Sequence, residues 1–144
     1  MTITHTGGCQ CGRIRYRLLL ENNDAYLCHC RMCQRATGGV AAAFINMLKS
    51  QRIWLNEPEY YASSPIAARP FCRECGTPLG FEYPDTARCD ITVGTLDDPS
   101  GFVPTSHFGA EGLLEAWLDT TALDRIRCDE HPSLVERWEK AKTE

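Results

Sequence analysis

The chain has 144 residues, the usual size of one domain, so we expect a single domain over residues 1–144. Apolar residues make up 43% of the sequence and charged residues 24%, a globular balance that excludes a disordered chain. The formal net charge of −4 argues against a nucleic-acid partner. The longest unbroken apolar run, residues 40–45, is too short to span a bilayer, which argues against a membrane partner.

The first eight residues, MTITHTGG, contain neither a basic segment nor an apolar stretch. No secretory signal is therefore visible, and we expect a cytoplasmic protein. Nine cysteines are many for such a protein. Because the cytosol keeps thiols reduced, a disulfide framework is not expected, and the cysteines are candidate metal ligands.

In the first half of the chain, alternation over residues 13–18 predicts a strand whose three arginines face solvent or attract an anionic ligand. Residues 31–37 follow a cysteine cluster and precede two glycines, which predicts a short helix. The apolar run 40–47 is typical of a buried strand. Residues 52–56 and 60–62 are shorter strand candidates.

In the second half, residues 89–93 alternate, which predicts a strand with Cys89 in the core. A loop is predicted over residues 95–101. Residues 126–128 repeat the alternation, so Cys128 is also predicted to be structural, and a capping box over residues 133–136 predicts a second helix. With only two helices, the fold is expected to be mainly β.

Seven of the nine cysteines lie in three short clusters. These are Cys9 and Cys11, then Cys28, Cys30 and Cys33, and then Cys72 and Cys75. Thiolates close in sequence reach one ion with little loop-closure cost, so the count suggests four ligands for one ion and three for another. Zinc fits this pattern best. The alternatives are buried cysteines acting as small hydrophobic residues, a redox dithiol, and an iron–sulfur cluster.

The neighbouring residues suggest which clusters share an ion. Cys11 and Cys75 are each followed by glycine, whereas Cys33 is followed by Gln34. Glycine tolerates the positive φ that the turn of a metal knuckle often requires. We therefore predict a closed structural site from the first and third clusters. The three cysteines of the second cluster then form a site with an open fourth position.

Four motifs in order resemble the glutathione-dependent formaldehyde-activating and centromere-protein-V family. They are residues 7–12 (GGCQCG), 28–39 (CHCRMCQRATGG), 71–79 (FCRECGTPL) and 93–99 (VGTLDDP). The resemblance covers most of the chain and implies a small Mss4-like β-tent fold with zinc knuckles. It also implies two zinc ions, one structural on Cys9, Cys11, Cys72 and Cys75, and one on Cys28, Cys30 and Cys33. The chain shows no obvious insertion that would build a glutathione-binding lid.

The charge of a three-thiolate zinc site favours one kind of chemistry. With a formal charge of −1 such a zinc is a poor Lewis acid, which disfavours hydrolysis. A thiol that binds there would instead become a nucleophilic thiolate. We therefore predict a carbon–sulfur lyase resembling S-(hydroxymethyl)glutathione synthase, with Cys28, Cys30 and Cys33 as its catalytic centre. The expected partners are a thiol such as glutathione and a small aldehyde.

Other residues are candidates around this centre. Arg31 and Arg35 either attract the carboxylates of glutathione or are solvated helix charges. His29 is a candidate second-sphere donor or zinc ligand, and His107 is a candidate acid or base. The rival function is a non-catalytic zinc module that binds a protein partner.

Overall fold

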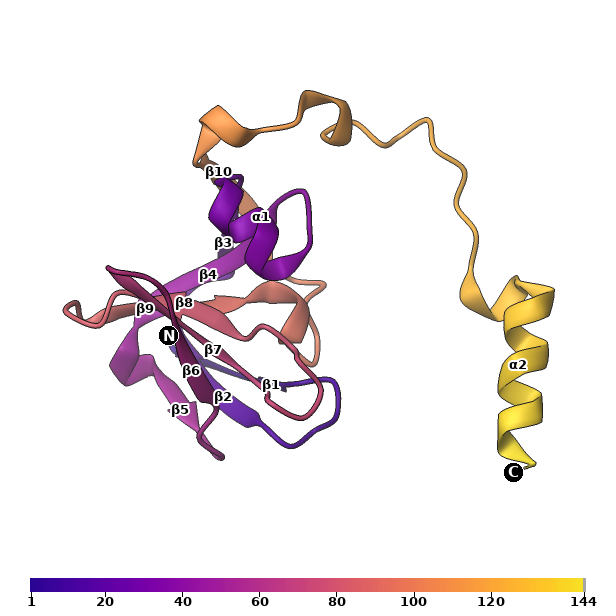
Figure 1. The fold of residues 1–144 in the computed structure, drawn as a ribbon, viewed down its shortest axis with the longest axis horizontal. Coiled ribbons are helices and arrows are strands. Elements are labelled where there is room, and N and C mark those ends of the chain that lie inside the picture. The colour runs from indigo at the N-terminus through magenta and orange to yellow at the C-terminus, as the bar shows by residue number, and fades with distance from the viewer. Residues whose placement is uncertain (144) are drawn as a thin grey trace. The chain divides into compact units, whose positions relative to one another are not determined.

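The computed structural model describes residues 1–143, which form two β-sheets with few short helices (Figure 1). The prediction of a mainly β fold is confirmed. The α-helices are α1 (Arg31–Thr37) and α2 (Pro132–Lys142). The strands are β1 (Ile3–Gly8), β2 (Arg15–Leu20), β3 (Asp24–Cys28), β4 (Ala42–Leu48), β5 (Arg52–Trp54), β6 (Glu59–Ser64), β7 (Ala67–Phe71), β8 (Gly80–Glu82), β9 (Arg88–Thr92) and β10 (Val103–Phe108).

The small sheet has the strand order β1-β2-β5, and the large sheet has the order β10-β3-β4-β9-β8-β7-β6. Within the described residues β10 pairs with β3 in parallel, and the other named strand pairs are antiparallel. The predicted strands near residues 13–18, 40–47, 52–56, 60–62 and 89–93 are all present, with boundaries shifted by at most two residues.

The main hydrophobic core joins the two sheets. In the small sheet Tyr16 and Leu18 alternate with exposed or half-buried arginines and are fully buried. From the large sheet Ile45, Met47 and Ile91 enter the same cluster. Cys89 is buried there too, as predicted. The period-two pattern of these strands therefore assigns one face of the large sheet to the core.

The arginines at positions 13, 15 and 17, in and just before β2, are used mainly within the protein. Arg13 forms an ion pair with Glu59, and Arg15 donates two hydrogen bonds to Asp97, of 2.9 and 2.5 Å. Arg17 is exposed. Two of the three arginines are thus matched by carboxylates of the chain itself, which leaves little basis for the anionic ligand considered from the sequence.

The opposite face of the large sheet carries a second set of side chains. Tyr26 on β3 pairs with Phe44 on β4, and Asp90 on β9 pairs with both Asn46 on β4 and Phe81 on β8. Cross-strand partners project from the same side of a sheet, and so do residues two apart on one strand. These five side chains therefore share one face, opposite the main core.

Helix α1 has the predicted bounds and clear termini. Its N-cap is Cys30, whose Sγ accepts a hydrogen bond from the backbone N–H of Cys33. At the other end Gly38 adopts φ of 76° and donates its N–H to the carbonyl of Gln34. A residue with positive φ after the last turn is a common helix stop.

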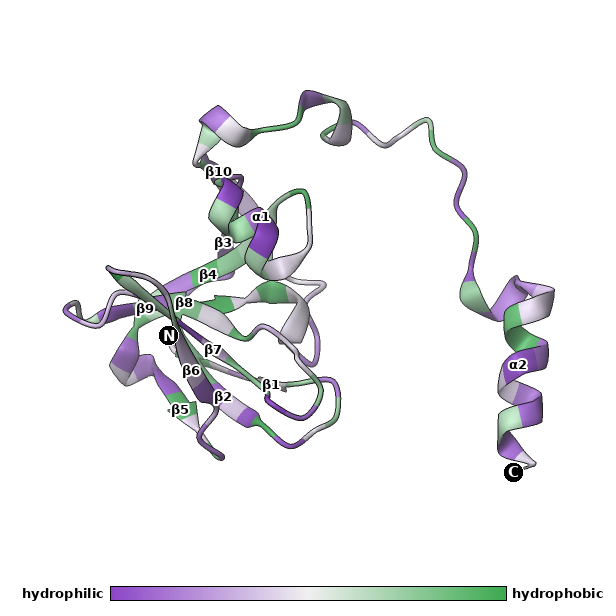
Figure 2. Ribbon diagram, in the orientation of Figure 1, coloured by the Kyte–Doolittle hydropathy of each residue, from purple (hydrophilic) through white to green (hydrophobic). Residues whose placement is uncertain are grey.

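The contacts of the chain divide it into two units, Met1–Leu114 and a second unit that begins at Glu115, and each is described by itself. The expectation of one domain over residues 1–144 stays a prediction. In the second unit α2 mixes hydrophilic and hydrophobic residues along its length (Figure 2). Of the helices described in residues 1–143, none is long and apolar enough to cross a membrane.

Two predictions in the second unit are wrong. The strand predicted over residues 126–128 is absent: Ile126 is 76% exposed, and Cys128 is exposed in a 3₁₀ turn. Alternation over three residues is too short to fix a strand without a partner strand. The capping box at Ser133 also fails, because α2 has His131 as its N-cap without a side-chain capping bond, and Pro132 begins the helix. Proline suits that first position because its missing N–H would lack a helical partner.

Candidate functional site

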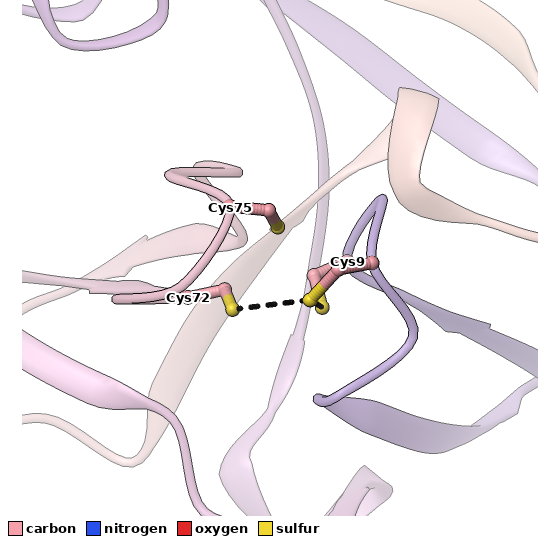
Figure 3. A group of neighbouring side chains, drawn as sticks. Cys9, Cys72 and Cys75 are labelled. Carbon is pink, nitrogen blue, oxygen red and sulfur yellow. Dashed lines mark hydrogen bonds between the residues drawn. The ribbon is translucent and has the colours of Figure 1, made fainter.

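The first and third cysteine clusters meet, as predicted. The Sγ atoms of this group all lie within 4.8 Å of one another; its members are Cys9, Cys11, Cys72 and Cys75. Figure 3 shows the side chains of Cys9, Cys72 and Cys75 turned toward one another. The Sγ atoms of Cys9 and Cys11 are 3.6 Å apart, and those of Cys11 and Cys72 are 3.8 Å apart. These separations are far above the length of a disulfide bond, about 2.05 Å.

Glycines shape both knuckles in the manner expected from the sequence. Gly12 and Gly76 have φ of 83° and 78°, and their N–H groups donate to the carbonyls of Cys9 and Cys72 at 3.1 and 2.7 Å. The backbone N–H of Ile14 donates to Cys9 Sγ at 3.2 Å. The tight turns therefore bring sulfur atoms and backbone donors together at one point.

The four sulfur atoms suit a tetrahedral zinc ion. With Zn–S bonds of about 2.3 Å, neighbouring sulfurs of a regular tetrahedron lie about 3.8 Å apart, close to the observed separations. The Thr77 hydroxyl lies 3.1 Å from Cys75 Sγ, and hydrogen bonding from its side chain and backbone lowers the pKa of the Cys75 thiol to about 5. Arg13 Nε donates to Cys72 Sγ at 3.4 Å. Hydrogen bonds thus favour the thiolate form of Cys72 and Cys75.

The second cluster forms a separate group where β3 ends and α1 begins. The ligand atoms of Cys28, Cys30 and Cys33 lie within 4.8 Å of one another, and the first two sulfurs are 3.6 Å apart. Among the residues that the structure describes, no fourth cysteine, histidine or carboxylate belongs to this group. The N-cap role of Cys30 explains the compact arrangement, because the first turn of the helix folds around its sulfur.

The surroundings of Cys28 and Cys33 favour the protonated thiol over a free thiolate. Burial raises the pKa of the Cys28 thiol to about 12. Burial also raises the pKa of Cys33, although the buried Arg69 opposes this by donating from Nη2 to Cys33 Sγ at 3.4 Å. Buried thiols ionise readily when they bind a divalent metal, so the sulfur set suits zinc.

A cavity of about 460 Å³ opens beside the three cysteines, all of which line it. Its floor is the face of the large sheet opposite the main core. Apolar side chains dominate the wall, among them the aromatic side chains of Tyr26, Phe44, Phe81 and Phe108. Phe44 is buried in one cluster with Cys28 and Cys33, so the aromatic wall is continuous with the sulfur group.

The cavity also holds two buried charged residues that the sequence analysis missed. Asp90 accepts a hydrogen bond from Asn46 Nδ2 at 3.0 Å, and burial raises the pKa of its carboxyl. The guanidinium of Arg69 lies over the Phe81 ring, 4.8 Å from its centroid. Both residues sit in ordinary alternating strands with no motif around them. In the sequence, the one feature that marks each of them is a charged side chain with apolar residues on both sides.

The two candidate histidines form a pair. His29 Nε2 lies 2.8 Å from His107 Nδ1, because the parallel pairing of β10 with β3 places residue 107 beside the start of α1. His29 is buried, and burial followed by the charge of His107 lowers its pKa. His107 is exposed and lines the cavity. Neither histidine belongs to the three-cysteine group, so the idea of His29 as one of its ligands finds no support.

The two arginines of α1 are exposed and lie outside the cavity wall. Arg31 Nη1 donates to Gln34 Oε1 at 2.6 Å. Arg35 lines a separate depression of about 330 Å³, which shares Met32 and Arg69 with the main cavity.

Three comparisons relate the chain to known proteins. A curated relative from Schizosaccharomyces pombe, named an uncharacterized lyase, is 33% identical over 82 residues, which are 55% of this chain. The matched region spans 58% of the length of that relative. A crystal structure of a Rhodobacter sphaeroides protein shares the fold at a TM-score of 0.57 and 22% identity, over 71% of this chain and 98% of that one.

The family comparison covers the whole region that carries the site. The model of the glutathione-dependent formaldehyde-activating enzyme family matches residues 4–111, which include both cysteine groups and the histidine pair. The chain therefore belongs to the glutathione-dependent formaldehyde-activating enzyme family.

Proposed function

We propose that this protein is a zinc-dependent carbon–sulfur lyase that adds a thiol reversibly to an aldehyde at the three-cysteine group. One observation carries the proposal: three clustered cysteines, without a fourth candidate ligand in the described chain, line a cavity of about 460 Å³. Catalytic zinc sites keep such an open position, whereas structural sites are closed. Family membership and the lyase name of the curated relative support the same reaction class.

The two cysteine groups would hold two zinc ions with different roles. Cys9, Cys11, Cys72 and Cys75 would hold a structural ion in a closed set of four thiolates. Cys28, Cys30 and Cys33 would hold the second. When bound there, zinc supplies acidification of a coordinated thiol, so that the thiol reacts as a thiolate at neutral pH.

The reaction needs a group that handles one proton. Sulfur uses an electron pair to form the C–S bond, the carbonyl π pair moves to oxygen, and the thiol proton ends on that oxygen. His107 is the group proposed to move this proton, because it lines the cavity and its Nδ1 lies 2.8 Å from Nε2 of the buried His29. Arg69 is a positioning residue, since it holds Cys33 Sγ by a hydrogen bond.

The thiol is proposed to be glutathione or a similar anionic thiol. Its carboxylates would face the outer surface of α1, where Arg31 and Arg35 are exposed. Arg35 is the stronger candidate, because its depression adjoins the cavity through Met32 and Arg69. Bidentate pairing of guanidinium with carboxylate is the physical basis of this assignment.

The substitution Cys30→Ser tests the proposal. We expect a folded protein that binds about one zinc ion instead of two and forms adduct from glutathione and aldehyde at least about 100-fold more slowly, since a ligand of the catalytic metal is lost. Metal analysis and an adduct assay measure both effects. Cys128→Ser is the matched control, because Cys128 is exposed and belongs to neither group. Unchanged turnover in Cys30→Ser would exclude this mechanism and favour a non-catalytic zinc module.

A further inference from the structure

The cavity is much larger than a one-carbon aldehyde requires. We propose that the carbonyl substrate of this protein is an uncharged aldehyde with an aromatic or branched apolar group, which packs on the wall formed by Tyr26, Phe44, Phe81 and Phe108. This inference rests on the proposed lyase function and specifies its substrate class.

The volume of the cavity supports an aldehyde larger than formaldehyde. The cavity of about 460 Å³ lies in the range typical of sites for whole small molecules, about 300–1,000 Å³. Formaldehyde has two heavy atoms and is little larger than a water molecule, whose share of liquid volume is about 30 Å³. A one-carbon substrate would leave most of the aromatic wall in contact with water. An aldehyde that carries a ring would cover that wall and gain its apolar burial.

The arrangement of the aromatic rings in the wall favours an aromatic substrate. The Tyr26 ring lies 5.7 Å from the Phe44 ring and 6.5 Å from the Phe108 ring, with tilted and edge-to-face orientations. Rings in such arrangements present the surfaces on which another aromatic ring packs well. Tyr26 and Phe81 pack against the buried cluster of Cys28, Cys33 and Phe44. A ring seated on this wall would therefore place its carbonyl carbon beside the sulfur group.

The lining of the cavity favours an uncharged substrate over a charged one. Two charged residues line the cavity: Arg69 bonds to Cys33 Sγ and stacks on Phe81, and Asp90 bonds to Asn46. The rest of the lining is mainly apolar, so a charged group of the substrate would lose its water among side chains that cannot replace it, which is costly. The charged ends of a thiol such as glutathione therefore belong outside this cavity, and the uncharged aldehyde belongs inside it.

The test has a binding arm and a turnover arm, both with the zinc-loaded full chain. Benzyl alcohol, an unreactive analogue of benzaldehyde, is titrated while protein NMR signals are recorded. Ser106→Trp narrows the cavity, because Ser106 lines it from β10, and Val103→Trp places the same ring on the same strand outside the cavity. We expect benzyl alcohol to bind the native chain and the Val103 variant, and to bind the Ser106 variant at least about 10-fold more weakly.

In the turnover arm, glutathione is combined with benzaldehyde or with formaldehyde. We expect kcat/KM for benzaldehyde to exceed that for formaldehyde by at least about 10-fold, and this ratio to fall by a similar factor in Ser106→Trp. A preference for formaldehyde, or equal benzyl alcohol binding by both tryptophan variants, would overturn the inference. If neither aldehyde reacts, the proposed lyase function fails, and the binding arm still decides whether the cavity accepts an aromatic ligand.

Discussion

Asp90 is a carboxyl group enclosed by aromatic rings, and its surroundings favour the protonated form. It is 6% exposed, and burial raises its pKa despite the hydrogen bond from Asn46. The nearby Tyr26 hydroxyl also has a pKa that is raised, first by burial and then by the charge of Asp90. A buried acid of this kind lowers stability at neutral pH, and such residues in a cavity are candidates for a functional role.

The substitution Asp90→Asn tests whether the buried carboxyl lowers the stability of the protein at neutral pH. The folded carboxyl keeps its proton to higher pH than the unfolded one, whose pKa is 3.8, so the native chain loses free energy of unfolding as pH rises through the raised pKa. The amide cannot ionise, so we expect Asp90→Asn to be more stable than the native chain at pH 8, with a smaller difference near the unfolded pKa of 3.8. Denaturant unfolding measures both. The exposed Asp85→Asn is the control, and a pH-independent difference would contradict the assignment.

At the scale of single elements, local patterns predicted the structure well. Helix α1 was predicted with correct bounds because its N-cap, its length and its glycine stop are all encoded within nine residues, Cys30–Gly38. The knuckles were predicted from cysteine spacing and the glycine that follows. Asp90 and Arg69 could not be assigned to the cavity, because their position depends on the pairing of β9 with β4, from which it is separated by residues 49–87, and on the pairing of β9, β8 and β7. The strand predicted over residues 126–128 is absent, because no neighbouring strand pairs with this local pattern.

The junction of β8 and β9 gives an element-scale prediction. A Cβ atom at Gly80 would collide with the backbone carbonyl of Asp90, so β9 would have to shift. We expect Gly80→Ala to lower the free energy of unfolding by about 1–3 kcal/mol, the usual cost of forced overpacking, and to weaken benzyl alcohol binding. Gly94→Ala is the control, since a Cβ there meets nothing within 4 Å and φ is not positive. Equal unfolding midpoints for the two variants would contradict this account.

At the scale of the whole molecule, the four-cysteine group connects chain segments that are distant in sequence. Cys9 and Cys11 follow β1 of the small sheet, while Cys72 and Cys75 follow β7 of the large sheet. A metal ion there would join the two sheets at the main hydrophobic core, to which Cys9 and Cys72 belong. In a unit of 114 residues such a link contributes a large share of the net stability.

The substitution Cys72→Ser tests the role of this group. Structural zinc contributes about 10–16 kcal/mol in small zinc peptides, which is comparable to the whole stability of a typical domain. We therefore expect most of the Cys72→Ser protein to be unfolded or insoluble, whereas Cys128→Ser folds normally. Circular dichroism and zinc content measure the outcome. A normally folded Cys72→Ser protein with its full zinc content would overturn the assignment of these four ligands.

The parallel pairing of β10 with β3 has a consequence for the order of folding. All seven clustered cysteines are present once residue 75 has been synthesised, yet β3 gains its β10 neighbour only after residue 108. Loop closure over so long a segment is slow relative to formation of α1 and the knuckles. The cysteines of both groups are therefore available to bind metal before His107 and Phe108 complete the wall of the cavity.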